Sequence, residues 1–112
     1  MALQVYTSQY RYSGDDRLDI TVKTSDGTFS PTWEMVKKYK SGELSDEEYT
    51  RRYLLLMQKS FIENRDKWEE LLSRERVTLV CFCPKGRFCH RRILANILVK
   101  IFGAEYKGEI EP

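Results

Sequence analysis

The 112-residue sequence contains no apolar run that is long enough to cross a bilayer. Its most apolar stretch, Ile93 to Ala104, is interrupted by Asn96 and Lys100 and falls short of the roughly 20 apolar residues that a membrane-spanning helix needs. The first residues also lack the basic segment followed by an apolar segment that is typical of a secretory signal peptide. These features predict a cytoplasmic protein without membrane contact.

Cysteine and histidine are scarce. The chain has three cysteines and one histidine, and all of them lie between Cys81 and His90. A secreted disulfide scaffold usually has an even number of cysteines spread along the chain. The odd, clustered set therefore excludes that class and indicates reduced thiols in a cytosol.

Acidic residues are absent from one segment of the chain. Between Val77 and Ala104 there is no aspartate or glutamate, whereas five lysines and arginines lie there. The whole chain has 19 basic and 17 acidic residues, so the remainder is mildly acidic. A positive segment on a mildly negative body favours an anionic ligand.

The apolar residues of the chain predict alternating strands and helices. Alternation and β-branched runs indicate strands at Leu3–Thr7, Leu18–Lys23, Val77–Phe82 and Tyr106–Ile110. Caps and helical spacing indicate helices from Ser30-Pro31 to Gly42, from the capping box Ser45–Glu48 to about Arg74 with a break near Asn64, and from Cys89 to Gly103. This order predicts an α/β fold: a single compact three-layer Rossmann-like domain over residues 1–112, with a mostly parallel sheet.

The segment Val77–Arg92 is the predicted functional site. It contains the three cysteines, the histidine and four cations, and it is expected to run from a buried strand through a Pro/Gly turn into a helix. In open α/β sheets, ligands bind beyond the carboxyl ends of the strands, where helix N-termini point. Reactive residues at such a junction indicate a site.

A thiolate centre is the first interpretation of this junction. Cys81 ends the strand, while Cys89 and His90 begin the following helix. A helix N-terminus and the neighbouring Arg91 and Arg92 stabilise a thiolate, so the pKa of Cys89 is expected to fall below its usual value of about 8.5. Cys81, Cys89 and His90 are then catalytic residues, and no cofactor is needed.

The same junction is also predicted to bind an anion. Gly86 allows the backbone to approach a phosphate closely, and Arg87 or Arg91 can clamp the phosphate oxygens. Asp19 and Lys23, on the polar face of the second predicted strand, can reach the same crevice. Tyr10, on the loop after the first strand, can stack on a base or a sugar.

Three other interpretations stay open. Cys81, Cys83, Cys89 and His90 are the donor set of a Cys₃His zinc centre, although their C-x-C-x₅-C-H spacing is unusual for zinc. Cys81 to Arg87 also satisfies the C-x₅-R pattern of a phosphatase loop, but Pro84 removes an amide that such a loop needs. Finally, the cysteines can simply be small buried side chains of the core.

The chain resembles a known family in these residues. Val80-Cys81, the element Cys89-His90-Arg91, Gly103 and the closing Gly108-Glu109 are similar to the family catalogued as domain of unknown function 488, and Asp19-Ile20-Thr21 matches its early Asp-Val-Arg strand. Thr21 replaces the family's arginine there, with Lys23 the nearest substitute, and Cys83 is an additional thiol. The resemblance implies a compact Rossmann-like fold and supports Cys81, Cys89, His90, Arg91 and Asp19 as site residues. It implies no established activity.

Two classes of function follow from these observations. The first is an enzyme that uses a cysteine thiolate on a phosphate-bearing small molecule such as a nucleotide, with His90 as proton donor or acceptor. The second is a non-catalytic module that binds a nucleotide or nucleic acid, with the Cys/His cluster structural or zinc-binding. The sequence leaves open whether a reaction is catalysed.

Overall fold

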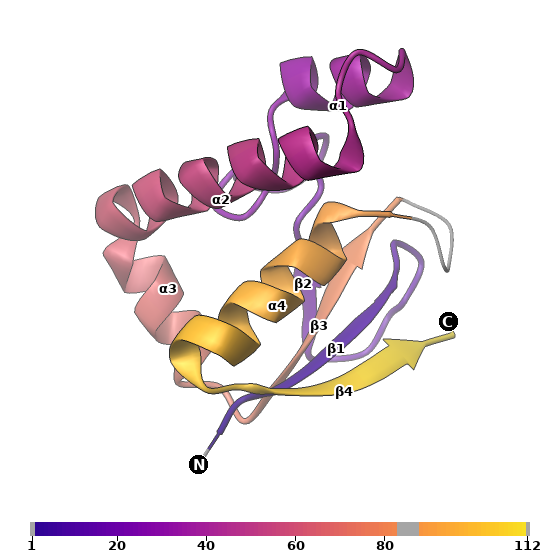
Figure 1. Ribbon diagram of the computed structural model, residues 1–112. Coiled ribbons are helices and arrows are strands. Elements are labelled where there is room, and N and C mark those ends of the chain that lie inside the picture. The colour runs from indigo at the N-terminus through magenta and orange to yellow at the C-terminus, as the bar shows by residue number, and fades with distance from the viewer. Residues whose placement is uncertain (1, 83–87, 112) are drawn as a thin grey trace.

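The computed structural model describes residues 2–82 and 88–111, which form four strands and four helices (Figure 1). The strands are β1 (Gln4–Gln9), β2 (Arg17–Asp19), β3 (Arg76–Cys81) and β4 (Glu105–Ile110). The helices are α1 (Trp33–Lys40), α2 (Asp46–Glu63), α3 (Arg65–Leu72) and α4 (His90–Phe102). None of the helices in this described part is both long and apolar enough to pass through a membrane.

All four strands run parallel in one sheet, in the order β2-β3-β1-β4. In the register, Gln9 of β1 lies opposite Cys81 of β3, so both strands end at the same edge of the sheet. The structure confirms the predicted compact α/β class of Rossmann-like three-layer type, and the sheet is parallel throughout. The carboxyl edge of such a sheet is where a ligand site is expected.

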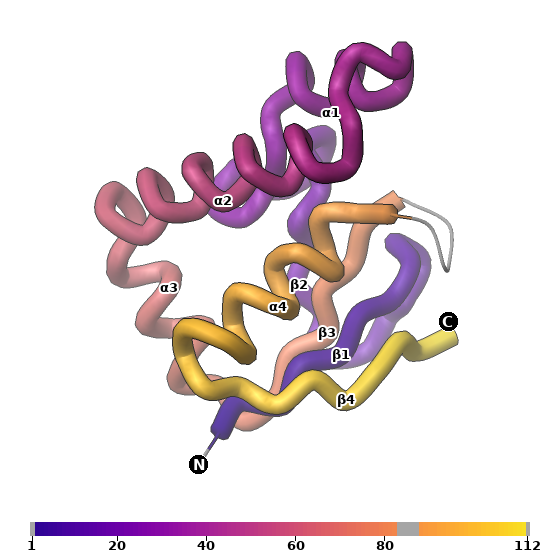
Figure 2. Tube along the Cα trace, in the orientation of Figure 1, coloured from indigo at the N-terminus to yellow at the C-terminus, as the bar shows by residue number. Residues whose placement is uncertain are grey.

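Helix α4 lies directly on the sheet, and the other helices are arranged beside it. Helix α4 packs against β1, β3 and β4, and α2 runs beside α4 (Figure 2). Helix α1 lies beyond the carboxyl ends of the strands, next to the start of α2 (Figure 1). The chain therefore places α1, the start of α2 and the start of α4 around one end of the sheet.

The local boundaries follow the sequence with two differences. Both partners of the capping box bond as predicted, since Ser45 accepts from the Glu48 amide and Glu48 accepts from the Ser45 amide. The first helix begins later than predicted, because Thr32 caps it by accepting from the Met35 amide at 3.2 Å. Strand β2 is shorter than predicted and ends at Asp19, whose carboxylate accepts from the Thr21 amide and turns the chain away from the sheet.

The core lies between the sheet and the helices. Trp68 of α3 is its largest fully buried side chain, and its ring contacts three other aromatic rings at centroid distances of 4.9–5.8 Å: Phe29, Phe61 and Phe102. Tyr53 of α2 is fully buried as well and donates a 2.6 Å hydrogen bond to the Phe29 carbonyl. These contacts hold the long segment between β2 and α1 against α2.

Gly103, the predicted stop of the last helix, ends α4 in the left-handed conformation at φ 76°. A Cβ added at this position would meet no atom within 4 Å, so only the backbone conformation opposes a side chain. Gly103→Ala is expected to lower the free energy of unfolding by about 1–2 kcal/mol. Gly103→Asn should cost less, because asparagine tolerates this conformation. Urea denaturation of both variants measures the difference, and equal costs would contradict the backbone explanation.

Candidate functional site

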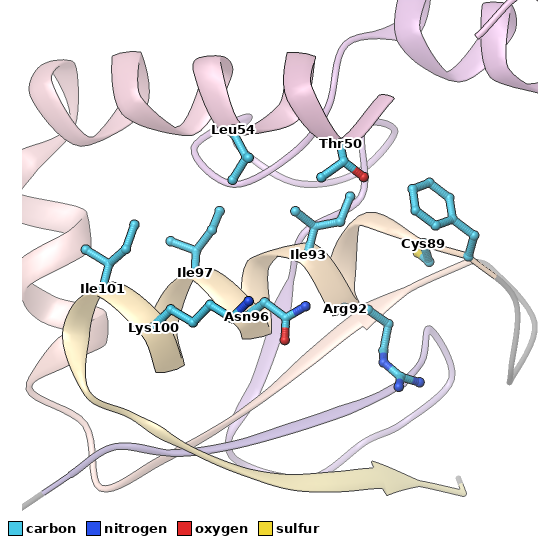
Figure 3. Close-up of a pocket in the computed structure, with 10 residues that line it drawn as sticks. Thr50, Leu54, Cys89, Arg92, Ile93, Asn96, Ile97, Lys100 and Ile101 are labelled. Carbon is cyan, nitrogen blue, oxygen red and sulfur yellow. The ribbon is translucent and has the colours of Figure 1, made fainter. Parts of the chain in front are cut away.

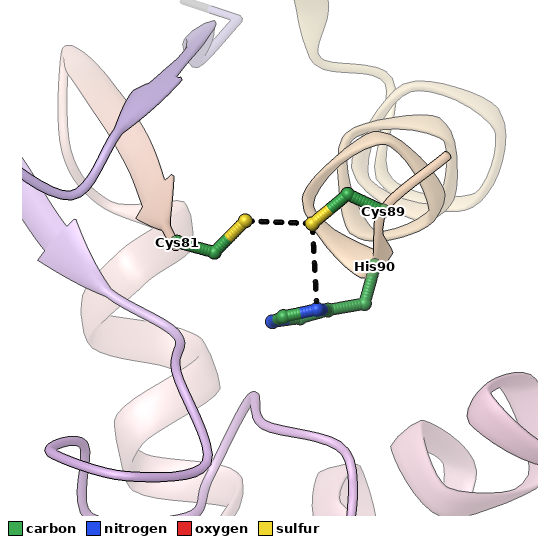
Figure 4. Close-up of side chains that lie close together, drawn as sticks. All are labelled: Cys81, Cys89 and His90. Atoms are coloured by element: carbon green, nitrogen blue, oxygen red, sulfur yellow. Dashed lines mark hydrogen bonds between the residues drawn. The ribbon is translucent and has the colours of Figure 1, made fainter. Parts of the chain in front are cut away.

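The three predicted catalytic residues lie together between the end of β3 and the start of α4. Cys81 is the last residue of β3, Cys89 is the extended N-cap of α4, and His90 is the first residue of the helix. Figure 4 shows the two sulfur atoms facing one another, with the imidazole of His90 beside the Cys89 sulfur. The sulfur atoms of Cys81 and Cys89 are 2.6 Å apart, and the Cys89 sulfur is 3.6 Å from His90 Nδ1.

Burial makes this cluster chemically distinct. Cys81 is 1% exposed, Cys89 2% and His90 6%. No disulfide bond joins the two cysteines. Hydrogen bonds and charges act strongly on groups that are removed from water, so the neighbours of the two sulfur atoms decide where protons and charge reside.

The backbone fixes the tautomer of His90. Its Nε2 lies 2.6 Å from the Ile20 carbonyl oxygen, which can only accept a hydrogen bond. Nε2 therefore carries the proton, and in the neutral ring Nδ1 presents a lone pair toward Cys89. Burial lowers the pKa of His90, against the opposing effects of Cys81, the Ile20 carbonyl and Asp19. His90 is thus a neutral proton acceptor beside the Cys89 thiol.

The lowered pKa of His90 predicts a pH dependence of stability. Only the unfolded state binds the proton between the unfolded value of about 6.5 and the lower folded pKa, so stability should fall as the pH decreases below about 6.5. The slope should not exceed about 1.4 kcal/mol per pH unit. Because His90 is the only histidine, its imidazole nitrogen signals in an NMR titration report the charge directly. An imidazolium formed at or above pH 6.5 in the folded protein would contradict this prediction.

Arg91 supplies the positive charge of the cluster. It is 1% exposed, and its Nη1 donates to the Cys81 sulfur at 2.9 Å. Its Nη2 and Nε donate to the two carboxylate oxygens of Glu109 at 2.8 and 3.3 Å. Burial acts to lower the pKa of Arg91, but the charges and hydrogen bonds of Cys81 and Glu109 outweigh it and raise that pKa. A guanidinium in this position favours the thiolate form of Cys81.

Glu109 belongs to the site, although its residue type and position in the sequence did not predict this. It lies on β4, opposite Thr7 of β1, and the Thr7 hydroxyl donates to its Oε1 at 2.5 Å. Tyr106 and Thr7 also share a 2.8 Å hydrogen bond. In the sequence, the only signal for Glu109 was its place in the Gly108-Glu109 element of the family resemblance.

A cavity of about 450 Å³ opens onto the cluster. Cys81, Cys89 and His90 all line it. Its other lining side chains include five aromatic rings and two lysines: Trp33, Tyr39, Tyr49, Phe82, Phe88, Lys23 and Lys40. The predicted ligand-binding residue Lys23 is therefore brought to the same cavity as the three reactive groups.

A second, larger cavity lies in the groove between α2 and α4 (Figure 3). Its volume is about 580 Å³, and Leu54, Ile93, Ile97 and Ile101 give it an apolar lining. Cys89 is its only lining residue from the reactive cluster. The smaller cavity, which all three reactive side chains line, is therefore the candidate active site.

The other predicted binding residues lie around this site in different roles. The sequence predicted that Arg91 binds an anionic ligand, but the structure buries it against Cys81 and Glu109. Asp19 accepts hydrogen bonds from Thr21 and Thr24, whose combined effect outweighs burial and lowers its pKa. The carboxylate of Asp19 thus organises the turn after β2, and Asp19 does not line the cavity that Cys81, Cys89 and His90 share.

Tyr10 contributes to the cavity indirectly. Its ring stacks on Phe82 with centroids 4.2 Å apart, and Phe82 is one of the lining residues. The guanidinium of Arg17 also lies over the Tyr10 ring, 4.5 Å from its centroid. Three residues named in the predicted site, Cys83, Gly86 and Arg87, lie outside the described residues.

Comparison with known proteins identifies a family model that covers most of the chain. The family model described as DUF488-N3a, "Active DUF488-N3 subclade", matches residues 3–101. No curated protein and no solved structure matches the chain. The matched range contains β3, the Cys89-His90-Arg91 element and nearly all of α4. The chain therefore belongs to the DUF488 family.

Proposed function

We propose that this protein is an enzyme in which the Cys81 thiolate acts on a phosphate-bearing small molecule of nucleotide type. The observation that carries the proposal is the 2.9 Å contact between the Arg91 guanidinium and the sulfur of Cys81, a residue that lines the cavity. A thiolate, and not a thiol, is the nucleophile in cysteine chemistry. The family description "Active" is in keeping with an enzyme.

The arrangement supports distinct roles for the three reactive side chains. The Cys81 sulfur would bond to the electrophilic atom of the substrate while the bond to the leaving group breaks. The thiol of Cys89, adjacent to that sulfur, is positioned to protonate the leaving group. His90 Nδ1 can then accept a proton from the water that releases the product and return a proton to Cys89.

The cavity walls support a ligand with a flat ring and a negative charge. Its volume of about 450 Å³ lies in the usual range of small-molecule sites, about 300–1,000 Å³. Trp33, Tyr39 and Phe88 offer ring faces for stacking. Lys23 and Lys40 are exposed side chains on the cavity, so they can meet phosphate oxygens without losing an ion pair.

Binding of AMP, compared with inorganic phosphate, tests this proposal. Titration calorimetry should detect AMP binding, and Lys40→Gln and Lys23→Gln should each weaken it by about threefold to tenfold, as expected for one charged contact. Lys37→Gln is the matched control, because it removes the same charge from α1 at a position that does not line the cavity. Equal effects of Lys37→Gln and Lys40→Gln would reject the cavity as the ligand site. Salt-sensitive oligonucleotide binding without AMP binding would favour the non-catalytic module.

Zinc binding is the second candidate, because the ligand atoms of Cys81, Cys89 and His90 lie within 4.8 Å of one another. Such a Cys₂His set would leave a fourth position for water or substrate, and the Ile20 carbonyl would orient the imidazole as in many metal sites. However, a tetrahedral zinc with bonds of about 2.3 Å would hold the two sulfurs about 3.8 Å apart. The observed 2.6 Å separation is shorter than a zinc ion between the two sulfurs would allow. One equivalent of zinc in the purified, untagged protein would overturn the thiolate mechanism.

A further inference from the structure

We propose that Cys81 and Cys89 form a peroxide-reactive modification site, at which a small hydroperoxide converts the two thiols into an intramolecular disulfide. The inference goes beyond the proposed function, although it rests on the same arginine-held thiolate of Cys81. Its ligand is a hydroperoxide, which is small enough to enter the cavity that both cysteines line.

The placement of the sulfur atoms favours an internal bond. They face each other at 2.6 Å across the junction between β3 and α4, as Figure 4 shows. Cys81 is 1% exposed and Cys89 2%, so a thiol of another protein has little access to either sulfur. An oxidised Cys81 would therefore react with Cys89 before it reacts with a thiol of another molecule.

The side chains around the pair supply what each step needs. The Cys81 thiolate attacks one oxygen of the peroxide, the O–O bond breaks, and Cys81 becomes a sulfenic acid while hydroxide leaves. His90 Nδ1 takes the proton of Cys89 and returns it to the departing hydroxide. The Cys89 thiolate then attacks the Cys81 sulfur and the S–O bond of the sulfenic acid breaks. The hydroxide released from Cys81 takes a proton from solvent, equivalent to the one that Cys81 lost when it ionised, and leaves as water. In sum, two thiols and one hydrogen peroxide give one disulfide and two waters.

The charges around the site allow the oxidised form to persist. The thiolate charge disappears when the disulfide forms, but Arg91 keeps its ion pair with Glu109 at 2.8 Å. The buried guanidinium is thus never left without a counter-charge. Access of substrate to the thiolate is lost until a reductant restores the pair, which makes oxidation a means of control over the site.

The test uses the full chain carrying Cys83→Ser, so that Cys81 and Cys89 are its only thiols. Treatment with a stoichiometric amount of hydrogen peroxide should remove both titratable thiols, lower the intact mass by two hydrogen atoms and yield a linked Cys81–Cys89 peptide. Dithiothreitol should reverse all three changes. In Cys83→Ser/Cys89→Ser, the sulfenic acid should accumulate on Cys81, where dimedone traps it.

Two results of these experiments would contradict the formation of a Cys81–Cys89 disulfide. Formation of a sulfinic acid on Cys81 without a linked Cys81–Cys89 peptide would overturn the proposal. So would dimedone capture on Cys89 in Cys83→Ser/Cys81→Ser together with no capture on Cys81 in Cys83→Ser/Cys89→Ser. If Cys83→Ser does not fold, peptide mapping of the oxidised wild-type protein replaces this test. A disulfide that involves Cys83 in place of the Cys81–Cys89 disulfide would contradict the proposal. None of these readouts needs a substrate, so failure to bind AMP leaves this test intact and the two proposals fail separately.

Discussion

Replacing Glu109 with alanine is expected to lower the free energy of unfolding by about 3–5 kcal/mol. The side chain of Arg91 is 1% exposed and that of Glu109 11%, so the ion pair is removed from water. Without Glu109, the buried guanidinium would lose the carboxylate that it faces, while its contact with the Cys81 sulfur would remain. Removing one partner of a buried pair costs more than the pair itself contributes, because the remaining charge is desolvated without compensation.

The control for this prediction lies on the same strand. Glu105→Ala also removes a carboxylate from β4, but the Glu105–Lys107 pair is largely exposed and should contribute less than about 1 kcal/mol. Glu109→Gln keeps the shape and one acceptor, and it should fall between the two variants. Urea denaturation at neutral pH measures all three. Similar losses for Glu105→Ala and Glu109→Ala would mean that the Arg91–Glu109 pair does not behave as a buried pair.

Replacing Cys81 with alanine is expected to reduce the rate of alkylation of the native protein by iodoacetamide roughly tenfold. An ordinary thiol is only a few per cent thiolate at neutral pH, whereas a thiolate held by a guanidinium is almost fully ionised. Part of this advantage is lost, because nucleophilicity decreases as a thiolate is stabilised. The reagent can reach Cys81 through the cavity that it lines.

This measurement is best made in a Cys83→Ser background, where Cys81 and Cys89 are the only thiols. Cys89→Ala in the same background is the matched control, since it leaves Cys81 and its Arg91 contact in place. The control should retain most of the rate, with peptide mapping locating the adduct on Cys81. A rate that depends on Cys89 and not on Cys81 would assign the nucleophile to the helix N-terminus.

Most of the fold was predictable from local patterns. The continuous apolar run of β3 and the apolar face of α4 indicated a buried parallel strand and a buried helix, and both exist within one or two residues. The capping box correctly predicted the start of α2 as well. Strand β2 was predicted too long, because alternation continues through Lys23 whereas the side-chain bond from the Thr21 amide to Asp19 ends the strand.

Of the site, only the residues that lie close together in the sequence were predictable. Cys81, Cys89 and His90 are neighbours in sequence or flank one short loop, so the strand-to-helix junction indicated them together. Glu109 reaches the site through the pairing of β4 with β1, and a single sequence does not reveal which acidic residue a buried arginine will meet. Arg91 was therefore assigned to a ligand, while in the structure its guanidinium meets Glu109 and Cys81.

The proposed function requires Cys81 to be a buried thiolate at neutral pH. The ultraviolet absorbance of the thiolate tests this requirement without a reagent that must enter the cavity. The difference spectrum between wild type and Cys81→Ala, followed across pH, should show one thiolate that is already present at neutral pH and absent from the variant. An absorbance that appears only as the pH approaches about 8.5, as for an ordinary thiol, would contradict the claim.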